Sequence, residues 1–367
     1  MKTKLKLGIV GCGGIAAGKH LPATAKLSGK CEAVAFCDEV KERAVKLAKE
    51  YGTADAKVYS DYKELVADKN VDVVYVLTPN VSHSTITIAA LENGKHVMCE
   101  KPMAHTSADA KKMLDAWKKS GKHFTIGYQN RFRPDAQALY KACAAGELGE
   151  IYYARAHALR RRAVPTWGVF PDKAKQGGGP LIDIGTHALD LTLWMMNSYK
   201  PVSVSGSVFY KLGASEDASS GNMFGPWDTK AYEVEDSAFG LIKFAGGATV
   251  YLESSWALNL RDAYEACTTL CGTKAGAEIR PNMSGSHDLI YNSTRHGQLT
   301  EERQSPGSSI AFFGGGHDSA GAAEAEAWID SIINDTEPLV NPEQAFTVTQ
   351  ILEGIYKSAE SGKEVFF

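Results

Sequence analysis

The stretch Lys4-Leu5-Lys6-Leu7-Gly8-Ile9-Val10-Gly11-Cys12-Gly13-Gly14-Ile15-Ala16 decides the fold of this chain. Residues 5–10 form an apolar run typical of a short buried strand, and the glycines after it suit a tight turn from strand to helix. Gly11 permits that turn, and Gly13 lets the backbone approach a pyrophosphate without a Cβ in the way. The N-terminus of the next helix offers free N–H groups and a positive dipole end. We therefore predict a dinucleotide site here, with Gly14 and Ile15 beside it; a glycine turn that binds nothing is the alternative.

A second apolar strand is expected over residues 32–37, and it ends in Asp38. A carboxylate at this place can accept hydrogen bonds from the hydroxyls of an adenine ribose. Glu39 follows it, and two adjacent carboxylates would repel the 2′-phosphate of NADP. The predicted cofactor is therefore NAD, although Lys41 and Arg43 lie near enough in the sequence to keep NADP open.

Composition excludes several classes of protein. At 367 residues and 44% hydrophobic content the chain is too long for one typical core, so we expect two domains. A formal charge of -3 gives no electrostatic reason to bind nucleic acid or an anionic membrane, and the cluster at 160–162 reads as a solvated face or a small-anion contact. No apolar run approaches the roughly 18 residues of a membrane span or the core of an export signal. The seven cysteines, an odd number, suit a reducing cytoplasm.

Strand and helix patterns alternate as far as Gly127, with further strands expected at 71–77, 96–99 and 123–128. This alternation is typical of a doubly wound parallel sheet, whose ligand crevice lies at the carboxyl ends of its strands. Thr78, Pro79, Asn80, Glu100 and Lys101 all fall at such ends.

Beyond Gly127 the pattern changes to runs of strands without intervening helices, which favours a large, mostly antiparallel sheet. Strands are expected at 151–159, 202–210, 236–244, 248–258, 266–272 and 276–280, a loop at 211–233, and helices at 135–145, 181–196, 320–334 and 342–361. We therefore expect a Rossmann domain over 1–127, an α+β substrate-binding and oligomerisation domain over 128–340, and a segment 341–367 whose helix packs back on the first domain.

Two groups of residues could carry chemistry. An ammonium at Lys101 could hydrogen-bond a substrate hydroxyl and favour its alkoxide, although a solvated lysine before a turn fits equally well. Asp183 and His187 lie four residues apart on one face of a predicted helix. A neutral imidazole can accept a hydroxyl proton and a carboxylate can fix its tautomer, whereas a surface Asp/His pair is the simpler explanation. No third ligand for a metal is evident.

Taken together, several motifs resemble the Gfo/Idh/MocA family of NAD(P)-dependent oxidoreductases. The resemblance spans essentially the whole chain and rests on residues 11–16, on Thr78-Pro79-Asn80 with His83, on Glu100-Lys101-Pro102, and on the run 179–187. It implies a nucleotide domain, a second domain whose open sheet commonly makes dimer or tetramer contacts, and a site between the two. The segments 129–133 and 165–170 look most like those of bacterial enzymes that oxidise the C3 hydroxyl of glucosides.

The resemblance also implies roles for individual residues. Lys101 matches the family's active-site lysine, His187 its general acid/base, and Asp183 the carboxylate that assists. Further cofactor contacts are expected from Gln129 and Trp167. In the reaction predicted here, the sugar pocket could be lined, through stacking and hydrogen bonding, by Trp167, Tyr128, Arg131, His157 and Trp256, although each of these alone is more typical of a core or surface residue. Two other functions stay open at this point: a glycoside hydrolase in which bound NAD is recycled within each turnover, and a non-catalytic NAD-binding sensor.

Overall fold

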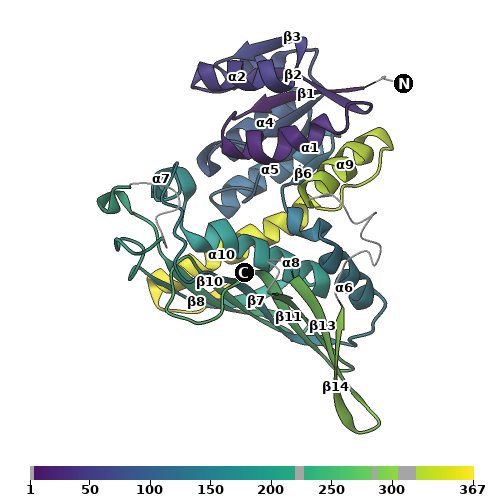
Figure 1. Cartoon of the computed structure of the whole chain (residues 1–367), viewed down its shortest axis with the longest axis vertical. Helices are drawn as coiled ribbons and strands as arrows, with labels where there is room; N and C mark the ends of the chain where they lie inside the picture. The colour runs from purple at the N-terminus through teal and green to yellow at the C-terminus, as the bar shows by residue number, and fades with distance from the viewer. Residues whose placement is uncertain (1–3, 220–226, 283–286, 305–319) are drawn as a thin grey trace. The chain divides into compact units, whose positions relative to one another are not determined.

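The computed structural model describes residues 4–219, 227–282, 287–304 and 320–367, so part of the loop expected at 211–233 lies outside the described residues. The chain forms two compact units. The first takes in the described residues of Met1–Gln129 and Asp318–Phe346, and the second those of Asn130–His317 and Thr347–Phe367. Figure 1 labels the elements of both. Within the described residues, no helix is both long and apolar enough to cross a membrane.

The first unit is built on a six-stranded parallel sheet with the order β3-β2-β1-β4-β5-β6. Its strands are β1 (Leu5–Val10), β2 (Cys31–Cys37), β3 (Gly52–Tyr59), β4 (Val73–Val76), β5 (His96–Cys99) and β6 (Phe124–Ile126). Ile9, Phe36 and Tyr75 are fully buried because helices cover both faces of this sheet. The strand order reverses between β1 and β4, which is the switch point where such sheets bind ligands.

The helices of this unit follow the predicted alternation. They are η1 (Ala16–His20), α1 (Leu21–Ala25), α2 (Lys41–Tyr51), α3 (Tyr62–Ala67), η2 (Asn80–Ser82), α4 (His83–Glu92), α5 (Ser107–Ser120) and α9 (Ala320–Ile333). Side-chain caps hold two of them: Asp61 accepts the N–H of Lys63, and Thr106 that of Asp109. Ser82, expected to cap α4, instead donates its hydroxyl to Thr78 Oγ1.

The second unit contains a nine-stranded sheet in the order β14-β13-β12-β11-β7-β10-β9-β8-β15. Its strands are β7 (Ile151–Leu159), β8 (Pro201–Phe209), β9 (Ser237–Phe244), β10 (Thr249–Ser255), β11 (Tyr264–Gly272), β12 (Gly276–Pro281), β13 (His287–Arg295), β14 (Gln298–Gln304) and β15 (Val365–Phe366). Among the described strands, β7 and β10 alone pair in parallel, and the other pairs in this sheet are antiparallel. The predicted fold, a doubly wound parallel sheet and a mostly antiparallel one, is confirmed.

The helices of this unit are η3 (Gln129–Phe132), α6 (Pro134–Ala144), α7 (Lys173–Gln176), η4 (Leu181–Gly185), α8 (Thr186–Met196), η6 (Thr229–Ala231) and α10 (Pro342–Ser361). Of these, α6, η4, α8 and α10 pack on the large sheet. Ala154, Ala156 and Ala158 of β7 face α8, which also packs on β11. The predicted helix over 181–196 is present, but its first turn, η4, is π-helical.

The second half of α10 packs on the large sheet, whereas we expected this helix to pack back on the first domain. Ile355 lies where Gly206 and Gly240 leave room between strands β8 and β9, and Ser358 accepts the N–H of Gly206. The helix up to Phe346 groups with the first unit. Because glycines on two neighbouring strands leave a groove for Ile355, the second half of α10 packs on the large sheet and not on the first domain.

Candidate functional site

The glycine turn after β1 has the geometry that its sequence predicts. Gly11 has a φ of 93°, and a Cβ there would lie 2.5 Å from the backbone oxygen of Leu77, so only glycine fits. A Cβ on Gly13 would meet no atom within 4 Å, which leaves open space beside the backbone. Ile15 is 41% exposed just before η1. The loop therefore has room for the pyrophosphate of a dinucleotide.

Asp38 holds this loop in place. Its Oδ2 accepts the N–H of Cys12 at 2.8 Å and its Oδ1 accepts that of Val40 at 2.8 Å. Because each carboxylate oxygen can accept more than one hydrogen bond, the partly exposed side chain can still receive ribose hydroxyls. The backbone contact was not predicted, and it links the two features that the sequence singled out.

His83 contacts the backbone of two loops, one at Thr78 and one at Pro102. Its Nε2 lies 2.9 Å from the backbone oxygen of Thr78, and its Nδ1 lies 2.8 Å from that of Pro102. The ring is fully buried. It thus ties the Thr78-Pro79-Asn80 loop to the turn that carries Lys101, a supporting position rather than an exposed one.

Glu100, the residue before Lys101, belongs to a buried ionic cluster that the sequence did not reveal. Glu100 Oε2 accepts the N–H of Lys101 at 3.0 Å, while its Oε1 lies 2.8 Å from both Lys19 Nζ and His20 Nε2. Lys19 Nζ also lies 3.2 Å from Gln129 Oε1, so Gln129, predicted to contact cofactor, belongs to this cluster. Burial alone would raise the pKa of Glu100, but Lys19 and His20 hold it well below its usual range.

The helix that carries Asp183 and His187 is anchored at its start. Glu235 accepts the N–H groups of Gly179 at 2.9 Å and Leu181 at 3.2 Å, and the hydroxyl of Tyr356 at 2.8 Å. A Cβ on Gly179 would lie 2.1 Å from the backbone oxygen of Glu235. Close approach therefore requires glycine at 179, and the buried carboxylate sits where a helix N-terminus favours negative charge.

Aromatic side chains surround Asp183. Trp256 Nε1 donates to Asp183 Oδ2 at 3.1 Å, and the Trp256 ring is fully buried. Phe170 meets Trp256 edge-on at a centroid distance of 6.4 Å and meets Trp167 at 5.0 Å. Trp167 is 44% exposed, and His187 is 9% exposed one turn beyond Asp183. The second unit thus contributes a carboxylate, an imidazole and an exposed indole. The rings of Trp256 and Phe170 support the carboxylate and the indole.

Two further expected sugar contacts are buried. Arg131 is fully buried and binds Asp190 through two hydrogen bonds, at 2.9 and 2.6 Å, with its guanidinium 5.4 Å from the Trp194 ring. Tyr128 follows β6 and is 1% exposed. The surroundings of Arg131 describe a structural ion pair that supports α8.

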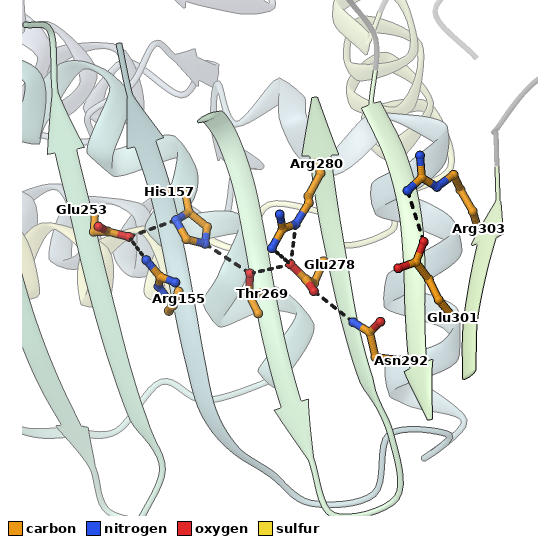
Figure 2. Close-up of polar contacts among 9 residues, drawn as sticks. All are labelled: Arg155, His157, Glu253, Thr269, Glu278, Arg280, Asn292, Glu301 and Arg303. Carbon is orange, nitrogen blue, oxygen red and sulfur yellow. Dashed lines mark hydrogen bonds and ion pairs between the residues drawn. The ribbon is translucent and has the colours of Figure 1, made fainter. Parts of the chain in front are cut away.

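His157 faces away from Asp183 and His187. It lies on the bare face of the large sheet, because the alanines that alternate with it on β7 face α8. Its Nδ1 lies 3.0 Å from Glu253 and its Nε2 lies 3.2 Å from Thr269. Figure 2 shows these contacts continuing across the strands to Glu278 and Arg280. The structure therefore does not bring His157 together with the other site residues of this unit.

Comparisons with known proteins place both units in one family. A model of the oxidoreductase family Gfo/Idh/MocA, described as an NAD-binding Rossmann fold, matches residues 5–128. The model of that family's C-terminal alpha/beta domain matches residues 141–367. The chain belongs to this family of oxidoreductases, and its first domain is of the NAD-binding type.

Particular relatives cover nearly the full length. The chain is 38% identical to D-glucoside 3-dehydrogenase of Escherichia coli (strain K12) over 363 residues, which is 99% of this chain and 97% of the relative. Among solved structures, aldose-aldose oxidoreductase from Caulobacter crescentus, complexed with glycerol, matches with a TM-score of 0.79 at 25% identity, over 99% of this chain and all of the other. Levoglucosan dehydrogenase, in complex with NADH and levoglucosan, shares the fold, with a TM-score of 0.83 at 21% identity over 99% of both chains.

Proposed function

We propose that the protein transfers a hydride between NAD and a secondary hydroxyl of a sugar, the C3 hydroxyl of a glucoside. The observation that carries this proposal is the full-length similarity to D-glucoside 3-dehydrogenase, in a chain that has a lysine, a carboxylate and a histidine at Lys101, Asp183 and His187. NAD, when bound, supplies the hydride acceptor. The residues of the chain then bind and orient the sugar and move the hydroxyl proton.

In this proposal His187 accepts the hydroxyl proton, because a neutral imidazole is a suitable base near neutral pH. Lys101 stabilises the negative charge that develops on the substrate oxygen. Asp183, held by the indole N–H of Trp256, orients the base or binds a neighbouring hydroxyl. Trp167, with its exposed indole, stacks on the sugar ring.

The open face of the large sheet supports the proposed homodimer or homotetramer. Phe209 and Leu241 are each 40% exposed, and Phe209 packs edge-on against Phe239 of the neighbouring strand. Leu241 lies on the bare face, because the residues that alternate with it on β9 face α10. A second copy covers this face in our proposal, so Leu241→Glu should shift the mass measured by light scattering towards the monomer. An unchanged mass, or a monomeric wild type, contradicts it.

Seven cysteines with free thiols support a cytoplasmic location, where thiols stay reduced. A fusion to a fluorescent protein and cell fractionation test this part of the proposal. Recovery in a membrane or periplasmic fraction contradicts it.

The reaction is tested with NAD and a panel of methyl glucosides, following the absorbance of reduced nicotinamide and the products by NMR. A 3-deoxyglucoside should give no reduced nicotinamide, whereas a 2-deoxyglucoside should still react. Oxidation of the 3-deoxyglucoside contradicts the C3 assignment. Cleavage of the glycoside without net reduction of NAD favours the redox-assisted hydrolase, and binding of NAD without any product favours the sensor.

The catalytic roles are tested with His187→Ala and Lys101→Met. Each should lower kcat by about 10²- to 10⁴-fold, the usual contribution of a general base or of a charge at the developing oxyanion. His296→Asn is the matched control, because His296 is exposed in the turn between β13 and β14. Full turnover in either catalytic variant contradicts the assignment.

A further inference from the structure

The cluster around Glu100 holds one lysine between two carboxylates. Lys19 Nζ lies 2.8 Å from Glu100 Oε1 and 2.9 Å from Glu324 Oε2. The side chains are 14%, 7% and 3% exposed, so water screens these charges weakly. Lys19 is on η1, Glu100 follows β5, and Glu324 is on α9, which lies against α1 in the same unit (Figure 1). Three separate elements of the first unit therefore bury one small group of charges.

Other titratable groups around it include His20, Tyr75, His83 and Cys99. Burial lowers the pKa of His83 and raises that of the Cys99 thiol, so both are neutral. His20 Nε2 contacts Glu100, and burial together with the nearby Lys19 lowers the pKa of His20, so this ring is neutral at physiological pH. The Tyr75 ring meets His20 edge-on, and burial raises the pKa of its hydroxyl well above the ordinary value, so Tyr75 is neutral as well. Burial would lower the pKa of Lys19, but Glu100 and Glu324 raise it, so the lysine stays charged.

The charges in this cluster do not balance. With Glu100 ionised, Lys19 neutralises one carboxylate, and a second ionised carboxylate leaves one buried negative charge. Burial raises the pKa of Glu324 to about 7, and Lys19 opposes that rise. Glu324 is thus the member whose proton decides whether the cluster is neutral or negative.

One member of the cluster contacts the backbone of Lys101, the residue proposed to act in the reaction. Glu100 receives Lys19 on one carboxylate oxygen and the N–H of Lys101 on the other. A change at Glu324 therefore reaches the Lys101 turn through Lys19 and Glu100, without a side chain of α9 having to touch a substrate.

We propose that Lys19 and Glu324 are positioning residues that set the charge next to the Lys101 turn, neutral when Glu324 holds a proton and negative when it does not. The inference rests on the proposed function, in which Lys101 acts beside the nicotinamide. A buried negative charge there favours the positively charged ring of NAD over the neutral ring of NADH. The preference of the protein for the oxidised cofactor accordingly strengthens as pH rises through neutrality.

The test measures the Kd of NAD by calorimetry and that of NADH by fluorescence, between pH 6 and 8.5 and without any sugar. In the wild type the ratio of the two constants should shift towards NAD as pH rises, by up to about tenfold, because a weakly screened unit charge contributes on the order of 1 kcal/mol at an effective dielectric constant of about 20. Glu324→Gln should keep the low-pH ratio throughout. Glu326→Gln is the matched control on the same helix, because Glu326 is exposed and pairs with Lys30.

A wild-type ratio that does not change with pH overturns the proposal, and so does a Glu324→Gln variant that keeps the wild-type change. If Glu324→Gln does not fold, Glu324→Met removes the same charge, and the wild-type titration alone still decides. The outcome is separate from the proposed function. A pH-dependent ratio without sugar oxidation contradicts the proposed function alone, whereas sugar oxidation with a constant ratio contradicts this inference alone.

Discussion

Two groups of buried charges, one in each unit, differ in their balance. In the second unit, Arg131 and Asp190 form a pair with two hydrogen bonds between one cation and one carboxylate. In the first unit, Lys19 faces both Glu100 and Glu324. Both groups lie next to elements that carry proposed catalytic residues: Asp190 is on α8 with His187, and Glu100 precedes Lys101.

The comparison shows how the ratio of buried cations to buried carboxylates affects protonation in a low-dielectric interior. A matched pair satisfies both partners, and a guanidinium does not give up its proton, so Arg131 and Asp190 act as a fixed support for α8. Glu100 and Glu324 share the same cation, Lys19, and burial raises the pKa of Glu324 to about 7. In these two groups, burial therefore goes with a matched ion pair in one case and with a titratable carboxyl, Glu324, in the other.

The largest expected effect comes from breaking the balanced pair. Arg131→Met leaves the buried Asp190 carboxylate without its cation, which should lower the free energy of unfolding by about 3–5 kcal/mol. Urea denaturation measures this loss. The double variant Arg131→Met/Asp190→Leu should recover most of it, because no lone charge remains. Equal losses of unfolding free energy in the single and double variants would show that the unpaired Asp190 charge is not the cause of the destabilisation.

The next effect sharpens the contrast through pH. Glu324 has a folded pKa of about 7 against an ordinary 4.5, so between these values the folded protein holds a proton that the unfolded chain has released. The free energy of unfolding therefore falls as pH rises through this window, by about 1.4 kcal/mol per unit and roughly 3 kcal/mol in all.

Glu324→Gln lacks this proton, so its stability relative to wild type should increase by roughly 3 kcal/mol between pH 4.5 and 8. Urea denaturation of both proteins across that range measures the difference, and Glu326→Gln should follow the wild type. Parallel stability curves for wild type and Glu324→Gln would contradict the assignment of the titrating proton to Glu324.

The smallest effect concerns the support of Asp183. Trp256→Phe keeps an aromatic ring but removes the N–H that Asp183 accepts at 3.1 Å. Loss of one such hydrogen bond, worth about 1 kcal/mol, should lower kcat/KM for a glucoside about fivefold. Steady-state kinetics measures this, with Trp117→Phe on α5 as the control. A kcat/KM that stays at the wild-type value would mean that Asp183 needs no orientation by Trp256.

The sequence predicts most of the first sheet because β1, β2, β4, β5 and β6 are short runs rich in buried apolar residues, whereas β3 mixes polar and apolar residues and is only partly buried. It does not predict β13 or β14. For β14 the reason is that Gln298–Gln304 is almost entirely polar and exposed, so it lacks an alternating apolar face. The glycine turn and Asp38 could be predicted because their residues are close in the sequence, so the local motif determines the geometry.

The buried ion pairs could not be predicted from the sequence, because their partners come from distant parts of the chain. In the sequence alone, Arg131 cannot be distinguished from a surface or substrate-binding arginine, because its partner Asp190 is far along the chain. Lys19 and Glu324 are likewise distant in the sequence, and they meet because α9 belongs to the first unit. Such partners are set by tertiary packing, and no local pattern marks them. The face of His157 was ambiguous for a related reason: alternation defines two faces of a strand but not which one helices cover.

Tyr356 has a consequence for how the protein is made. It is synthesised after Gly178, Gly179 and Glu235, yet its hydroxyl completes the anchor at the start of the helix with Asp183 and His187. A nascent chain on the ribosome therefore holds every proposed catalytic group before it can fix this helix. Fragments that stop before α10 would lack the hydroxyl that Glu235 accepts and would leave the start of this helix incompletely held.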